Sequence, residues 1–147
     1  MKKPLCERID QIGVVVHSID EYLKNFEKLF GKNVFKIIEG EPVRIFEDGH
    51  QEKIKAKAAF LQLGNIQLEL IEIIEGPAIH SKWLKERGEG IHHLGMYVSD
   101  FDKSLKEFQD EGIKILHLGR GRMRYAYMDT KPFCIEIIEK IPDSPSK

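Results

Sequence analysis

The chain has 147 residues, of which 41% are hydrophobic and 32% are charged, a balance typical of one soluble globular domain. Lys and Arg number 23 against 24 Asp and Glu, so there is no basic excess of the kind that nucleic-acid-binding proteins carry. Two cysteines are too few for a disulfide scaffold, and no apolar run approaches the roughly 20 residues that cross a bilayer. Because the N-terminus also lacks the apolar stretch of a secretory signal, we expect a cytoplasmic single domain over residues 1–147 that binds neither nucleic acid nor membrane.

The predicted elements follow one another as two similar runs. The first run opens with a strand at 13–16, and apolar residues then recur at helical spacing between a Ser18–Glu21 capping box and Gly31. The elements expected next are strands at 34–39, 54–63 and 66–74 and a linker helix at 77–87. The second run has a strand at 95–98, a helix that Asp100 caps and Gly112 ends, and strands at 113–118, 124–129 and 133–139.

The two runs are copies of one module, because their sequences align without gaps. Residues 9–26 and 91–108 share seven identical residues in eighteen positions. Residues 59–72 align in the same order with residues 126–139, and Glu69 then matches Glu136. We therefore predict an α+β fold of two tandem βαβββ modules, over about 8–75 and about 90–140, which the helix at 77–87 joins.

Four polar side chains occupy equivalent places in the two modules. Side chains alternate between the two faces of a strand, and the repeat superimposes Gln11 on His93 and Glu69 on Glu136, all on the face away from the helices. Each residue alone also has a plain interpretation, such as a solvent-facing glutamate or a hydrogen-bonded core histidine. If the modules pair face to face, however, the four groups converge, and their donor atoms then suit a shared metal site.

The other histidines give weaker signals. Alternation along the strand places His92 on the helix side, where we expect a structural role. His80 and His117 show no spacing typical of metal ligands, and the same holds for His17 and His50.

The segments IDQIGVVV, LELIE, IEIIE and GEGIHHLGMYV resemble the vicinal oxygen chelate superfamily, which includes glyoxalase I, methylmalonyl-CoA epimerase, ring-cleaving dioxygenases and bleomycin-resistance proteins. The resemblance covers Ile9 to Glu139. It implies an eight-stranded curved sheet that forms a cup, and a homodimer, because members of the superfamily commonly pair through these sheets.

The resemblance also implies roles for particular residues. The four ligand positions of the superfamily fall on Gln11, Glu69, His93 and Glu136, a set of oxygen and imidazole donors that suits a divalent ion such as Zn, Ni, Co or Mn. In glyoxalase I-like enzymes the residue corresponding to Glu136 both ligates the metal and transfers protons. Epimerases use a further catalytic glutamate, and counting back from Glu69 places it at Glu52.

Two features of the sequence favour different activities within the superfamily. Gln11 stands where epimerases usually have histidine, and the resulting ligand set resembles that of one class of glyoxalase I (lactoylglutathione lyase). GEGIHHLGMYV instead resembles methylmalonyl-CoA epimerases. We expect a metal-dependent lyase or isomerase that moves a proton next to the carbonyl of a small thioester or hemithioacetal substrate. The alternative is a non-catalytic binding module of the bleomycin-resistance type.

Overall fold

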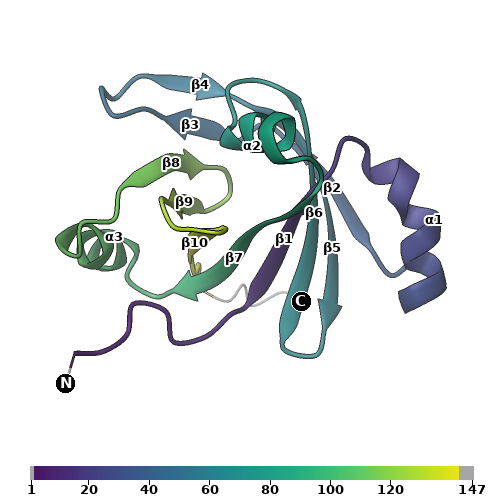
Figure 1. Cartoon of the computed structure of the whole chain (residues 1–147), viewed down its shortest axis with the longest axis horizontal. Helices are drawn as coiled ribbons and strands as arrows, with labels where there is room; N and C mark the ends of the chain where they lie inside the picture. Colours follow the sequence, from purple (N-terminus) through teal and green to yellow (C-terminus); the bar gives the residue numbers. More distant parts are fainter. Residues whose placement is uncertain (1, 143–147) are drawn as a thin grey trace.

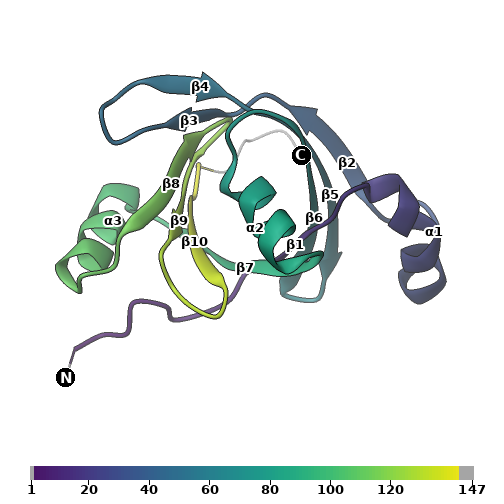
Figure 2. The ribbon, with the colours of Figure 1, turned by 45° about the horizontal axis from the view of Figure 1, so that its top comes forward.

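One strongly curved sheet organises the protein, and Figures 1 and 2 show how it bends around an open inner face. The computed structural model describes residues 2–142. The first half of this range contains β1 (Gln11–Val15), α1 (Ile19–Phe30), β2 (Lys36–Gly40), β3 (Val43–Ile45), β4 (Gln51–Lys53), β5 (Lys55–Leu63) and β6 (Ile66–Glu75). After α2 (Ile79–Arg87) come β7 (Gly90–Val98), α3 (Phe101–Asp110), β8 (Ile115–Arg120), β9 (Arg124–Met128) and β10 (Cys134–Glu139).

The two modules join at the centre of the sheet. The strand order over residues 2–142 is β2-β5-β6-β1-β7-β10-β9-β8-β3-β4, and β1 pairs with β7 in antiparallel orientation. In each module the last strand lies parallel to the first, as β6 to β1 and β10 to β7. This arrangement confirms the predicted α+β fold with its repeated modules.

The described sheet has ten strands where the sequence predicted eight, because β3 and β4 form an extra hairpin between the strands expected at 34–39 and 54–63. The hairpin turns through Gly49, whose φ of 92° suits glycine, and Phe46 accepts the Gly49 N–H at 2.9 Å. β3 pairs with β8 of the other module, so that Ile45 lies opposite Leu118. A strand of three residues needs such a distant partner, and local periodicity does not reveal it.

Helices α1 and α3 cover the outer side of the sheet at opposite ends (Figure 1). Ile19 of α1 packs in one core cluster with Val16, Ala59 and Leu70, and Phe101 and Phe108 of α3 pack in the other with Met96, Val98, Ala126, Met128 and Ile137. The apolar face predicted from strand alternation is therefore the face that the helices cover. Within residues 2–142, no helix is both long enough and apolar enough to span a bilayer.

The N-terminal caps follow the prediction at α3 only, whereas Gly31 ends α1 as expected. Asp100 accepts the Lys103 N–H at 3.1 Å and caps α3 as expected. The predicted Ser18–Glu21 capping box is wrong, because the Ser18 side chain makes no capping hydrogen bond. Glu72 on β6 accepts the Ile19 N–H at 2.9 Å instead. A carboxylate from a neighbouring strand therefore accepts a hydrogen bond from a backbone N–H in the first turn of α1.

Candidate metal centre

Four neighbouring strands at the middle of the sheet bring the predicted donors together. Gln11 lies on β1, Glu69 on β6, His93 on β7 and Glu136 on β10, the strands that run side by side as β6-β1-β7-β10. Gly13 makes room for this group, because it pairs with both His93 and Glu69 and a Cβ atom there would overlap the His93 ring. The group therefore depends on the junction between the two modules.

The donor atoms lie at hydrogen-bond distances from one another. His93 Nε2 is 3.1 Å from Gln11 Oε1, 3.1 Å from Glu136 Oε1 and 3.4 Å from Glu69 Oε1. His93 is fully buried, Gln11 and Glu136 are almost as deeply buried, and the Glu69 side chain is 13% exposed. The convergence predicted from the internal repeat is therefore present in the structure.

The donor set fits a divalent cation. Atoms that bind one ion at about 2.1 Å lie roughly 3.0–3.4 Å apart, and the measured separations fall in this range. Gln11 Nε2 donates to Gln67 Oε1 at 2.8 Å, which leaves Gln11 Oε1 facing the other donors. Four possible ligand atoms then lie close together, and the two carboxylates balance the charge of a divalent ion.

A protonated arrangement also satisfies these atoms. With Gln11 Nε2 directed at Gln67, Gln11 Oε1 can accept the Nε2–H of a protonated His93 at 3.1 Å. Burial lowers the pKa of His93, but the charges and hydrogen bonds of Glu136 and Glu69 outweigh this effect and raise it to about 9. Burial raises the pKa of Glu69. Protons and a metal ion therefore compete for the same lone pairs.

We expect the metal-free protein to lose stability as the pH rises from about 6.5 to about 9. The pKa of His93 is about 9 in the folded chain, above that of an unfolded histidine, so its stabilising effect is complete below about pH 6.5 and disappears as the pH rises through about 9. Urea unfolding of chelator-treated protein should show a fall on the order of 3 kcal/mol. Metal-saturated protein is the control, and an equal fall there would contradict this prediction.

A cavity of about 620 Å³ opens above the donor group. Gln11, Glu69 and Glu136 form part of its wall, which also includes Ile38, Ile54, Phe60, Ile71, Tyr97, Tyr125, Tyr127 and Ile138. Burial and the carboxylates Glu136 and Glu69 raise the pKa of Tyr127 well above its ordinary value. Its hydroxyl therefore stays protonated and can act as a hydrogen-bond donor beside Glu136.

The structure does not bring Glu52 to this cavity. Glu52 lies exposed on β4, opposite Arg44, and its Oε2 is 3.2 Å from His50 Nε2. The count back from Glu69 crossed the segment that forms the β3–β4 hairpin, and this hairpin carries Glu52 to the far edge of the sheet. The glutamate of this region that does line the cavity is Glu41.

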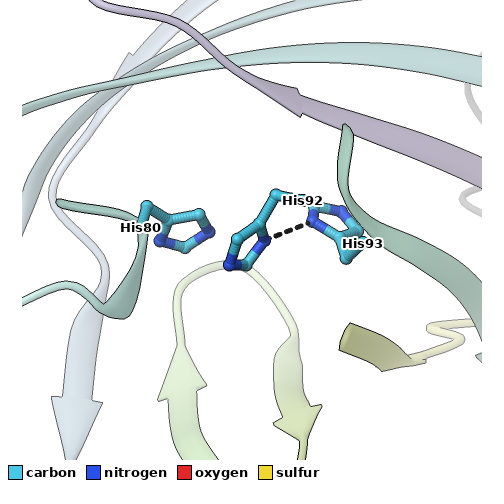
Figure 3. Close-up of side chains that lie close together, drawn as sticks. All are labelled: His80, His92 and His93. Atoms are coloured by element: carbon cyan, nitrogen blue, oxygen red, sulfur yellow. Dashed lines mark hydrogen bonds between the residues drawn. The ribbon is translucent and has the colours of Figure 1, made fainter. Parts of the chain in front are cut away.

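Two further buried histidines, His80 and His92, lie beside the donor group, although their spacing in the sequence indicated no metal-binding role. Figure 3 shows His80 of α2 next to the adjacent pair His92 and His93. The expectation that His92 lies on the side of the sheet that α1 and α3 cover is wrong, because a β-bulge in β7 interrupts the alternation of side chains: Gly13 pairs with His93 and Val14 with Ile91. The feature of the sequence that could have indicated this histidine cluster is the pair of consecutive histidines in an apolar strand.

The fold and the donor group define the class of protein. A family model described as the Glyoxalase/Bleomycin resistance protein/Dioxygenase superfamily matches residues 10–130, and the chain belongs to this superfamily. The resemblance seen in the sequence, to the vicinal oxygen chelate superfamily, is thereby confirmed.

Two curated relatives match part of the chain. The uncharacterized protein YqjC of Bacillus subtilis is 27% identical over 112 residues, which cover 74% of this chain and 70% of YqjC. The mitochondrial methylmalonyl-CoA epimerase of Bos taurus is 26% identical over 110 residues, which cover 74% of this chain and 57% of the bovine protein.

Solved structures of methylmalonyl-CoA epimerases share the fold. The Mycobacterium tuberculosis enzyme has a TM-score of 0.67 and 21% identity, with 97% of this chain and 93% of that chain covered. A variant of the Streptomyces coelicolor enzyme, in complex with 2-nitronate-propionyl-CoA, has a TM-score of 0.68 and 23% identity, with 94% of this chain and 98% of that chain covered.

Proposed function

We propose that this protein is a metal-dependent isomerase or isomerising lyase, which moves a proton at the carbon next to a substrate carbonyl. The observation that carries the proposal is the convergence of one imidazole, one amide and two carboxylates at the wall of a mainly apolar cavity. A bleomycin-type binding module needs a cavity but does not need this set of donors.

Gln11, Glu69, His93 and Glu136 are the residues proposed to hold the ion. An ion held by these side chains would supply Lewis acidity toward a substrate carbonyl, and so would stabilise negative charge on its oxygen. Two carboxylates would keep a divalent ion and its ligands close to neutral.

Glu136 is the proposed base. Its carboxylate is buried at the cavity wall, so it can take the proton from the substrate carbon, hold it on oxygen and return it. Tyr127, which remains a neutral donor, is placed to orient this carboxylate. For a reaction that returns a proton to the opposite face of the carbon, the structure supports Glu41 rather than Glu52 as the second acid–base group, because only Glu41 lines the cavity.

Two substrate classes fit this chemistry. The sequence similarity to methylmalonyl-CoA epimerases supports an acyl-CoA thioester, and Arg122 at the cavity offers positive charge to its phosphates. Gln11, with its glyoxalase I-like ligand set, supports a hemithioacetal formed from a ketoaldehyde and a thiol. Both reactions remove a proton next to a carbonyl, so the donor group alone fits either.

Proton exchange in deuterated water separates the two reactions. We would load the protein with Zn²⁺, Ni²⁺, Co²⁺ or Mn²⁺ in turn and follow methylmalonyl-CoA and the methylglyoxal–glutathione adduct by NMR. Loss of the C2 proton signal from the CoA ester alone selects epimerisation, and formation of a hydroxy thioester from the adduct alone selects glyoxalase chemistry. Absence of both reactions in protein with stoichiometric metal would reject both named activities, and absence of metal binding would reject the proposal itself.

A further inference from the structure

Strand β7 turns two consecutive histidines toward the inner face of the sheet. His92 and His93 are both completely buried, although neighbouring residues of a regular strand face opposite sides. The bulge between the Gly13–His93 and Val14–Ile91 pairs leaves His92 without a partner in β1 and allows this orientation. The bulge therefore places a second imidazole directly behind the one that faces the carboxylates.

The two imidazoles contact each other through the same ring atom. His92 Nδ1 and His93 Nδ1 are 3.1 Å apart, as the dashed line in Figure 3 marks. His93 Nε2 faces Gln11, Glu69 and Glu136 on the other side of its ring. A neutral His93 that offers the Nε2 lone pair to a cation carries its proton on Nδ1 and must donate it to an acceptor.

His92 offers a nitrogen acceptor at this place. It is completely buried, and a neutral imidazole keeps one lone pair on a ring nitrogen. The ring is held in place by the rings of His80, Trp83 and Tyr127, whose centroids lie 4.5, 5.0 and 5.3 Å from its own. Its Nε2 has no protein partner, so the Nδ1 atom makes the only side-chain hydrogen bond of His92 among the described residues.

We propose that His92 is a positioning residue of the metal centre: its Nδ1 accepts the Nδ1–H of His93 and fixes the tautomer and ring orientation in which His93 Nε2 faces the ion. The inference rests on the proposed function, because it requires a metal at this place. Histidine ligands usually donate to a carboxylate or a carbonyl. An uncharged imidazole acceptor adds no third negative charge to a site that already holds Glu69 and Glu136.

Metal affinity of three variants tests the proposal. His92→Leu removes the acceptor, whereas His92→Asn retains an acceptor because its amide oxygen can replace Nδ1. His117→Leu is the matched control, since His117 is equally buried but makes no contact with His93 nitrogen atoms. In competition with a chromophoric chelator, we expect His92→Leu to bind Zn²⁺ about 10–100-fold more weakly than wild type, and the other two variants to stay within about threefold.

The wild-type protein supplies a second test that does not depend on the folding of a variant. In ¹⁵N-histidine-labelled, Zn²⁺-loaded protein, we expect the His93 proton on Nδ1, the His92 proton on Nε2 and a scalar coupling between the two Nδ1 nuclei. A His93 proton on Nε2, a His92→Leu affinity equal to wild type, or a second bound Zn²⁺ lost with His92 would each overturn the inference. Equal weakening in His92→Asn and His92→Leu would also overturn it, because packing alone would then explain the effect.

The failures of the two proposals are distinguishable. Wild-type protein that binds no divalent ion would remove the proposed function and this inference together. Wild-type protein that binds Zn²⁺ while His92→Leu binds it equally well would remove the inference and leave the proposed function intact.

Discussion

Glu136→Gln is expected to abolish most turnover while the protein remains folded. The substitution keeps the size of the side chain but removes the negative charge from a group whose Oε1 lies 3.1 Å from His93 Nε2. A neutral amide is a weaker ligand for a divalent ion and cannot act as a base, so two losses combine. We expect activity on an accepted substrate to fall at least about 100-fold, with a parallel loss of metal affinity.

Glu139→Gln is the matched control for this prediction. Glu139 lies on the same strand, but it pairs with Arg124 outside the donor group, at 2.8 Å. An ion pair of this exposed kind contributes about 1 kcal/mol or less, so the control should fold and turn over normally. Steady-state kinetics of both variants at saturating metal make the comparison. Wild-type turnover in Glu136→Gln would show that Glu136 is neither the base nor an essential ligand.

Gly13→Ala is expected to damage the metal centre through one added methyl group. A Cβ atom at this position would fall inside van der Waals contact with three atoms of the His93 ring. His93 has no free space to move into, because it is fully buried between the donor carboxylates and His92. Overpacking of this kind costs about 1–3 kcal/mol of folding stability, and the displaced ring can no longer align Nε2 with the other donors.

Urea unfolding and Zn²⁺ competition measure the two effects of Gly13→Ala. The control is Gly40→Ala, since a Cβ atom at Gly40 meets nothing within 4 Å and its φ lies outside the left-handed region. We expect the control to retain wild-type stability and metal affinity within experimental scatter. Unchanged Zn²⁺ affinity in Gly13→Ala would mean that His93 does not need its present position to bind the metal.

The internal repeat is what made the fold and the donor group predictable from the sequence. Because the modules are copies, Gln11 and His93 had to occupy equivalent places, as had Glu69 and Glu136, and strand alternation placed all four on one face. Local patterns of this kind also located α1, α3 and the Asp100 cap, since hydrophobic spacing and capping act within a few residues.

Tertiary structure decided the features that depend on distant partners. The β3–β4 hairpin exists because β3 pairs with β8 of the other module, and this pairing moved Glu52 away from the cavity. The bulge in β7 reversed the expected direction of His92, since the register between β1 and β7 shifts there. Glu72 of β6 replaced Ser18 as the cap of α1 because the folded sheet places its carboxylate at the helix N-terminus. Each of these depends on a residue contributed by another strand, and the spacing of neighbouring residues carries no information about such a partner.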